Sequence, residues 1–195
     1  MGLKTLINIA VALFTFPIFA GTLFISDVDD TLKNSKVRNP IKIIEQAFKT
    51  GKRVMVPGMN LAFQEMVRAD DAQGIYYVSK IPSFLSYLHV AFLTKNDFPG
   101  GYLVTRKLER DFKYQNIGRI IVKEAPTRVV LIGDNGEADA KVYLRLKRAF
   151  KGENIEFKIF IRKAYPDNIK YTNQIQYFKN GRGLLKLLSK NGIIR

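Results

Sequence analysis

The chain has 195 residues, 47% of them hydrophobic and 25% charged, a balance typical of a globular protein with a proper core. It has no cysteine and one histidine, so disulfides, zinc–thiolate sites and thiol nucleophiles are excluded, and catalysis must use carboxylates, hydroxyls, lysine and arginine. The net charge is +15, and residues 141–195 hold 14 Lys and Arg against 3 Asp and Glu, which indicates an anionic partner or a solvated basic face.

Residues 1–20 are typical of an export signal. Lys4 supplies a positive charge, an uncharged apolar stretch follows, and the small residues Ala20–Gly21 offer a cleavage site. The alternative is an uncleaved membrane anchor, because Leu6–Ile25 carries no charge and is long enough to span a bilayer. We expect cleavage and a periplasmic or extracellular location, because the end of this stretch is needed for the first core strand.

Strand and helix patterns alternate along the rest of the chain. Short apolar runs predict strands at 22–26, 53–56, 74–79 and 128–132, and alternation predicts a half-buried strand at 156–161. Helical spacing predicts helices at 41–49 and 60–67, from Pro82 with Phe84, Leu85, Leu88 and Phe92 on its apolar face, and at 115–123, 138–150 and 183–189. The alternation predicts a three-layer α/β sandwich with a mainly parallel, Rossmann-like sheet, in which ligands bind at the carboxyl ends of the strands.

Three carboxylates lie within four residues directly after the first strand, in Asp27-Val28-Asp29-Asp30-Thr31. Carboxylates this close repel one another unless they surround a cation or share a proton. One aspartate can act as a nucleophile that forms an acyl phosphate, and another two residues on can protonate the leaving group and then deprotonate water. The alternative is an acidic turn that caps a helix.

Further polar residues follow later strands. Asp134 and Asp139 lie five residues apart on a glycine-containing loop, which suits magnesium, although an Asx turn with a helix cap is the alternative. Ser79 ends a strand and Lys113 precedes a helix, so both could hold phosphoryl oxygens. Taken alone, such a serine is more often a helix cap, and one lysine among 32 basic residues has little weight. His89 lies in a predicted helix away from these motifs, and we interpret it as structural.

Together these motifs resemble the haloacid dehalogenase-like (HAD-type) phosphohydrolase superfamily. The resemblance lies in DxDxT at 27–31, then Ser79, Lys113 and GDxxxxD at 133–139, in that order. The joint occurrence of the four is far more specific than any one of them.

Longer segments are similar to the catalytic domain of the actin-patch-associated phosphatidate phosphatases. The similarity covers about residues 22–165, and residues 166–195 lie outside it as a basic C-terminal extension. It rests on the segments SDVDDTLKNSKV, VPGM, YYVSKIPSFL, FPGGYL, FKYQNIGRII, VVLIGDNGEADAKVY and IFIR.

The resemblance implies a phosphomonoester hydrolase that works through a phosphoryl-aspartate. Asp27 would attack phosphorus, and Asp29 would act first as general acid and then as general base. Ser79 and Lys113 would bind the phosphoryl group. Lys80 stands where these phosphatases usually have a small residue, so it could add a phosphate contact or narrow the pocket.

The resemblance also implies a magnesium ion. Asp27, the backbone carbonyl of Asp29, and Asp134 would hold Mg²⁺, and Asp139 would support it. Asn135, directly after Asp134, stands where these phosphatases usually have a serine. This difference leaves the catalytic groups intact.

The substrate implied by the resemblance is phosphatidate or a related lipid phosphate. The basic C-terminal third is compatible with peripheral contact with an anionic membrane, and we expect no specific nucleic-acid binding. The 183–189 helix could make such a contact or could pack on the core. The alternatives are an exported phosphatase for soluble nucleotide or sugar phosphates, and a non-catalytic polyanion-binding module. The length of the chain predicts one domain, 21–195. Because the chain between Ser79 and Lys113 is too short for a large cap domain, we also expect little or no cap and an open site.

Overall fold

The structure, a computed structural model, describes residues 21–34, 54–106, 111–136, 138–166 and 173–195. The predicted export signal and the predicted helix at 41–49 lie outside these residues. Within the part of the chain that is described, no helix is both long and apolar enough to cross a bilayer.

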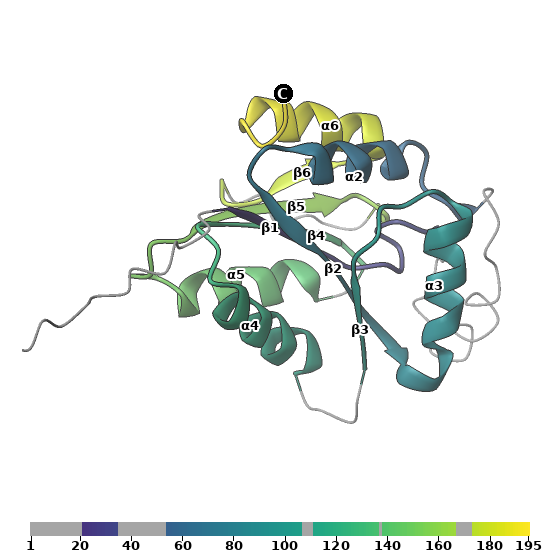
Figure 1. The fold of residues 1–195 in the computed structure, drawn as a ribbon, viewed down its shortest axis with the longest axis horizontal. Helices are drawn as coiled ribbons and strands as arrows, with labels where there is room; N and C mark the ends of the chain where they lie inside the picture. The colour runs from purple at the N-terminus through teal and green to yellow at the C-terminus, as the bar shows by residue number, and fades with distance from the viewer. Residues whose placement is uncertain (1–20, 35–53, 107–110, 137, 167–172) are drawn as a thin grey trace, which may run out of the picture.

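A six-stranded parallel sheet forms the middle layer, in the order β3-β2-β1-β4-β5-β6 (Figure 1). Its strands are β1 Thr22–Ser26, β2 Ala72–Pro82, β3 Tyr102–Arg106, β4 Arg128–Asp134, β5 Glu156–Arg162 and β6 Gln176–Phe178. The α/β fold with a parallel sheet is therefore confirmed, and so are the four longest predicted strands. The predicted strand at 53–56 is wrong, because Met55 makes only an isolated bridge to Lys33.

Helices cover both faces of the sheet, with α2 and α6 on one side and α4 and α5 on the other, while α3 flanks the sheet beyond β3 (Figure 1). The helical elements are α2 Met59–Arg68, the 3-10 turn η2 Ser83–Leu85, α3 Ser86–Lys95, α4 Phe112–Glu124, α5 Asp139–Ala149 and α6 Gly181–Lys190. Pro82 ends β2 rather than starting a helix. Phe84 was expected on a buried face, but it lies in η2 with 76% of its surface exposed.

The core has two layers because side chains alternate along each strand. Phe24 in β1 packs in the cluster that includes α2 and α6, whereas Leu23 and Ile25 pack in the cluster that includes α4 and α5. Leu184 and Leu188 of α6 are fully buried in the first cluster. Of the two expectations for the last helix, packing on the core is therefore the one that the structure confirms.

The strand order places the carboxyl ends of β1 and β4 side by side. The chain moves from β1 to β2 and β3 on one side, and then returns to β4 on the other side of β1. The backbone N–H of Asp27 donates to the carbonyl of Ile132 at 2.9 Å, which continues the β1–β4 pairing beyond Ser26. In parallel α/β sheets such a point of reversal is where ligands bind.

Candidate active site

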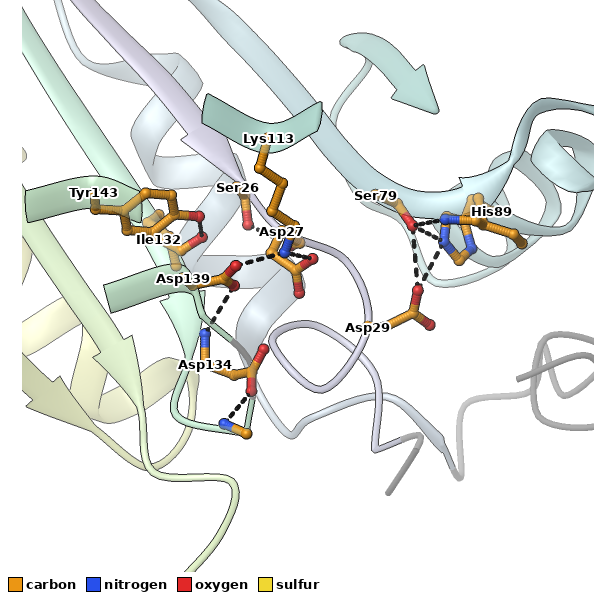
Figure 2. A network of polar contacts seen from close by, with 12 residues as sticks. Ser26, Asp27, Asp29, Ser79, His89, Lys113, Ile132, Asp134, Asp139 and Tyr143 are labelled. Carbon is orange, nitrogen blue, oxygen red and sulfur yellow. Dashed lines mark hydrogen bonds and ion pairs between the residues drawn. The ribbon is translucent and has the colours of Figure 1, made fainter. Parts of the chain in front are cut away.

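A buried lysine joins two carboxylates, one just after the end of β1 and the other at the start of α5. The Lys113 Nζ donates to Asp27 Oδ1 at 2.8 Å and to Asp139 Oδ1 at 2.6 Å, and all three side chains are buried (Figure 2). Lys113 reaches this position because it lies in the first turn of α4, whose N-terminus faces the carboxyl edge of the sheet. Three of the residues predicted for the site are thus in direct contact.

Asp134 completes this cluster from the end of β4. Its Oδ1 accepts from the backbone N–H of Gly136 at 2.5 Å, and its own backbone N–H donates to Asp139 Oδ2 at 3.4 Å. Gly133 has no room for a side chain, because a Cβ there would lie 2.7 Å from Asp139 Oδ2 and 2.9 Å from Tyr143 Cε2. A glycine at this point lets α5 bring Asp139 close to the strand end.

The residues present fit a divalent metal ion. Asp27, Asp134 and Asp139 are all buried, and each can offer one carboxylate oxygen so that the three oxygens lie within 4.8 Å of one another. Three carboxylates exceed the single ammonium of Lys113 by two formal charges, which is costly in a buried site without a further cation. Oxygen ligands of this type suit a hard ion such as Mg²⁺.

A second polar cluster lies at the end of β2 (Figure 2). The Ser79 hydroxyl donates to Asp29 Oδ2 at 3.2 Å and accepts from the backbone N–H of Ile81 at 3.1 Å. The His89 Nε2 lies 2.8 Å from Ser79 Oγ and 3.1 Å from Asp29 Oδ2. The prediction that His89 lies away from every motif is therefore wrong.

Strand alternation explains which residues meet Ser79. Ser79 shares a face of β2 with Tyr77, whereas Lys80 shares the opposite face with Val78, which packs in the α4 and α5 cluster. After Pro82 the chain turns back through η2 into α3, and the first turn of α3 carries His89 over Ser79. Ten residues separate the two in sequence, and no spacing rule links a strand residue to a helix residue across such a turn.

Lys80 lies on the other side of β2 and lines a cavity of about 350 Å³. Arg106 at the end of β3 and Lys113 and Tyr114 of α4 line the same cavity. The cavity therefore opens beside the buried lysine and has a basic wall. Lys80 itself is exposed, and its predicted contact with a phosphate stays a prediction.

Residues at the end of β5 and just after it hold the loop that follows β1 and carries Asp29 and Asp30. The Arg162 guanidinium donates to the carbonyl of Asp30 and to Asn34 Oδ1, both at 2.6 Å. Burial lowers the pKa of Arg162 from its usual value, and the nearby carboxylates of Asp30 and Asp134 oppose this effect. The Tyr165 hydroxyl also donates to the Asp30 carboxylate. The sequence contained Arg162 in a resemblance segment, but gave no reason to connect it with Asp30.

Two more buried groups surround the site without having been predicted. Lys33 is buried 5.7 Å from the centre of the Phe92 ring, and burial lowers its pKa although Asp29 and Asp30 oppose this. The Tyr143 hydroxyl donates to the Ile132 carbonyl at 2.9 Å. Burial, with the Asp139 charge as the next cause, raises the pKa of Tyr143 well above its usual value, so Tyr143 stays a neutral donor.

Comparisons with known proteins were made against families, curated proteins and solved structures. Residues 22–163 match the family described as phosphatidate phosphatase APP1, catalytic domain. No curated protein matches the chain. Among solved structures, a class C acid phosphatase from Bacillus anthracis with tungstate bound is 14% identical, with a TM-score of 0.42, over 83% of this chain and 67% of that chain.

Proposed function

Because this chain belongs to the family of phosphatidate phosphatase catalytic domains and is a phosphatase, we propose that it hydrolyses phosphomonoesters through a phosphoryl-aspartate on Asp27. The observation that supports this most strongly is the buried contact of Lys113 with Asp27 and Asp139 at the end of β1. A nearby ammonium keeps a carboxylate ionised, and it can also neutralise the oxygens of an approaching phosphoryl group.

The reaction has two steps. In the first, a carboxylate oxygen of Asp27 forms a bond to phosphorus while the bond to the leaving oxygen breaks, and Asp29 gives that oxygen a proton. In the second, Asp29 takes a proton from water, the water oxygen attacks phosphorus, and Asp27 is released with inorganic phosphate. Ser79 and Lys113 bind phosphoryl oxygens in both steps, and positioning supplies most of the rate, as is usual for phosphoryl transfer.

We propose that the acidic cluster holds Mg²⁺ through Asp27, Asp134 and the backbone carbonyl of Asp29. When bound, the ion would neutralise charge on the phosphoryl oxygens. Asp139 has a supporting role in this proposal, because its Oδ1 accepts from Lys113 and its Oδ2 from the backbone of Asp134.

We propose phosphatidate or a related lipid phosphate as the substrate. Support comes from the family and from exposed apolar side chains next to the site: Phe84, Tyr87 and Val90, which we call the rim patch, are 76%, 54% and 52% exposed. The rim patch follows β2, so it lies at the edge of the sheet that carries Asp27. Exposed aromatic and aliphatic side chains of this kind are suited to a lipid–water interface.

A basic hollow on the far side of the same edge also favours contact with an anionic membrane. Its volume is about 560 Å³, and its lining includes Lys163, Lys179, Arg182 and Lys186. Lys163 follows β5 and Lys179 follows β6, so the parallel sheet brings both to the carboxyl edge. Each basic residue near an anionic bilayer contributes about 1 kcal/mol of attraction.

We also propose that residues 1–20 direct export and are removed, and that 21–195 form one domain. Mass spectrometry of the protein recovered from the periplasm or medium tests this. A first residue at or near Gly21 is expected, whereas an intact N-terminus in the membrane fraction would favour the anchor.

The activity is tested by phosphate release with and without Mg²⁺. The panel contains phosphatidate in mixed micelles, a soluble short-chain phosphatidate, nucleotides and sugar phosphates. We expect Mg²⁺-dependent release from phosphatidate, abolished in Asp27→Asn and retained in the control Asp70→Asn, an exposed aspartate at the opposite edge. Release from soluble esters alone would be consistent with the proposed mechanism but would contradict a lipid substrate. Release without a metal ion would contradict the proposed role of Mg²⁺.

The membrane contact is tested by sedimentation with vesicles of anionic and neutral phospholipid. Phe84→Asp should weaken binding to anionic vesicles about tenfold while leaving hydrolysis of the soluble substrate unchanged. Val122→Asp is the matched control, because Val122 is 71% exposed near the end of α4 that is remote from the strand ends. Equal effects of the two variants would contradict a specific contact at the rim patch.

A further inference from the structure

One nitrogen of His89 contacts two residues of the proposed mechanism at once. Its Nε2, Ser79 Oγ and Asp29 Oδ2 form a triangle with sides of 2.8, 3.1 and 3.2 Å (Figure 2). The His89 side chain is fully buried, while Asp29 remains one-third exposed. A buried imidazole thus contacts a carboxylate that is open to solvent and to a substrate.

The geometry determines which nitrogen carries the proton. If Nε2 lacked a proton, its lone pair would face the Asp29 carboxylate at 3.1 Å, which is repulsive. The Nδ1 is buried and has no hydrogen-bond partner among the described residues, so a proton there would be an unsatisfied donor. Both arguments place a proton on Nε2, where it donates toward Asp29 Oδ2.

This contact is not the relay of a Ser-His-Asp triad. A relay requires the serine on one ring nitrogen and the aspartate on the other, whereas both partners of His89 lie on Nε2. The contact therefore lacks the geometry of a serine nucleophile relay, which agrees with the assignment of the nucleophile role to Asp27.

We propose that His89 is a positioning residue for Asp29, an inference that rests on the proposed role of Asp29 as general acid and base. Two donors, the Ser79 hydroxyl and His89 Nε2–H, hold Oδ2, and the second carboxyl oxygen points away from them (Figure 2). Because both donors occupy Oδ2, the second oxygen is the one that can exchange a proton with a leaving group.

His89 also makes the hydroxyl of Ser79 available to substrate. The hydroxyl has one proton, and in the absence of substrate Asp29 Oδ2 accepts it. If a phosphoryl oxygen accepted the hydrogen bond from this hydroxyl instead, the Asp29 carboxylate would have one donor fewer. Because His89 Nε2–H remains on Oδ2, Asp29 keeps its orientation while Ser79 turns to the phosphate.

The test compares two leaving groups in the same enzyme sample. Short-chain phosphatidate, or glycerol phosphate if soluble esters are preferred, has an alkoxide leaving group that needs a proton. The aryl ester 2,4-dinitrophenyl phosphate releases a stable phenolate that does not. The value compared is kcat/KM, which reports the first step, and its ratio between the two esters does not depend on how much of a variant is folded.

For His89→Leu we expect kcat/KM to fall about 10- to 100-fold on the alkyl ester and less than about threefold on the aryl ester. With the aryl ester, a full burst of phenolate should precede a slowed steady state, because Asp29 also activates water in the second step. His89→Gln, whose amide can place a donor near the same point, should restore the ratio to within about threefold of wild type.

Each outcome has a distinct meaning. Asp29→Asn should show the same dependence on leaving group more strongly, and if it does not, the role proposed for Asp29 is wrong. Suppose that Asp29→Asn shows the dependence on leaving group. If His89→Leu then lowers kcat/KM equally for both esters, or if His89→Gln gives the same ratio as His89→Leu, His89 is structural only and the inference fails. If His89→Leu does not fold, His89→Asn replaces it, because its amide is too short to reach Oδ2, and the same ratios decide.

Discussion

The space around Gly133 is too small for any side chain. A Cβ there would lie closer than 3.0 Å to two atoms of Asp139 and to the Tyr143 ring. Gly133→Ala must therefore displace Asp139 from Lys113, and we expect phosphate release to fall at least about 100-fold. We also expect a loss of about 1–3 kcal/mol in the free energy of unfolding, measured by urea denaturation.

Gly118→Ala is the matched control for this substitution. Gly118 lies inside α4, and a Cβ there would contact only Leu146 Cδ2 at 3.8 Å. Alanine is better than glycine within a helix, so we expect a gain of about 0.5–1 kcal/mol with unchanged activity. Similar effects of the two variants would contradict the close packing around Asp139.

Asn135, which differs from the usual residue of the resembled family, has a local role. Its Oδ1 accepts from the backbone N–H of Ala164 at 2.8 Å and of Tyr165 at 3.0 Å, and its Nδ2 donates to the Tyr165 carbonyl at 2.8 Å. The side chain thus ties the loop after β4 to the loop after β5, which in turn contacts Asp30 through Tyr165.

We expect Asn135→Ala to lower the free energy of unfolding by about 1–3 kcal/mol, because three backbone groups lose their partner. Asn116→Ala is the control, since the amide of Asn116 donates to the carbonyl of Phe112 in the same helix, and this substitution should cost less than about 1 kcal/mol. Thermal unfolding of both variants is the measurement. A smaller loss in Asn135→Ala than in Asn116→Ala would mean that the loops are held by other contacts.

Two glycines of α6 differ in how closely they approach a neighbouring element. A Cβ on Gly181 would lie 1.9 Å from the carbonyl oxygen of Gly58, at the start of α2, whereas a Cβ on Gly183 would meet nothing nearer than 3.5 Å. Gly181→Ala must separate α6 from α2, and we expect a loss of about 3 kcal/mol or more. Gly183→Ala should be neutral or stabilise by up to about 1 kcal/mol.

Guanidinium denaturation of the two variants measures this difference, and because they lie two positions apart in one helix, each controls for the other. Equal stability would mean that the two helices can move apart at little cost.

At the level of elements, burial decided what the sequence could predict. The strands β1, β2 and β4 contain continuous apolar runs because helices cover both faces of the sheet there, and such runs can be recognised in a sequence. The unpredicted strands β3 and β6 are the two edges, where one is partly exposed and the other has three residues. Phe84 misled the prediction of a helix face because an exposed aromatic residue is indistinguishable from a buried one in sequence.

For the whole molecule, the rule that ligands bind at strand ends predicted the site only in part. It correctly brought Asp27 and Asp134 together, because β1 and β4 are neighbours. It could not show that Asp29 turns toward Ser79, nor that His89 lies there. Those contacts depend on the crossing of α3 over the end of β2, which no local pattern encodes.

The C-terminal extension belongs to the core of the molecule rather than to its surface. The family match ends at residue 163, yet Phe178, Leu184, Leu188 and Ile193 are buried in the same cluster as Phe24 of β1. These side chains cover the face of the sheet beside α2, with Gly181 against Gly58.

Removal of residues 166–195 should therefore abolish cooperative unfolding, although all four predicted motifs remain in the shortened chain. Leu188→Ala, which opens a cavity at one point of the same interface, should cost about 2–5 kcal/mol and keep the transition cooperative. Lys190→Ala, at an exposed position of the same helix, should change stability by less than about 0.5 kcal/mol.

Calorimetry of the three proteins and the full chain gives the comparison. If the shortened chain unfolded cooperatively and released phosphate, the matched segment would fold by itself, and the buried contacts of α6 would be an addition to a complete domain.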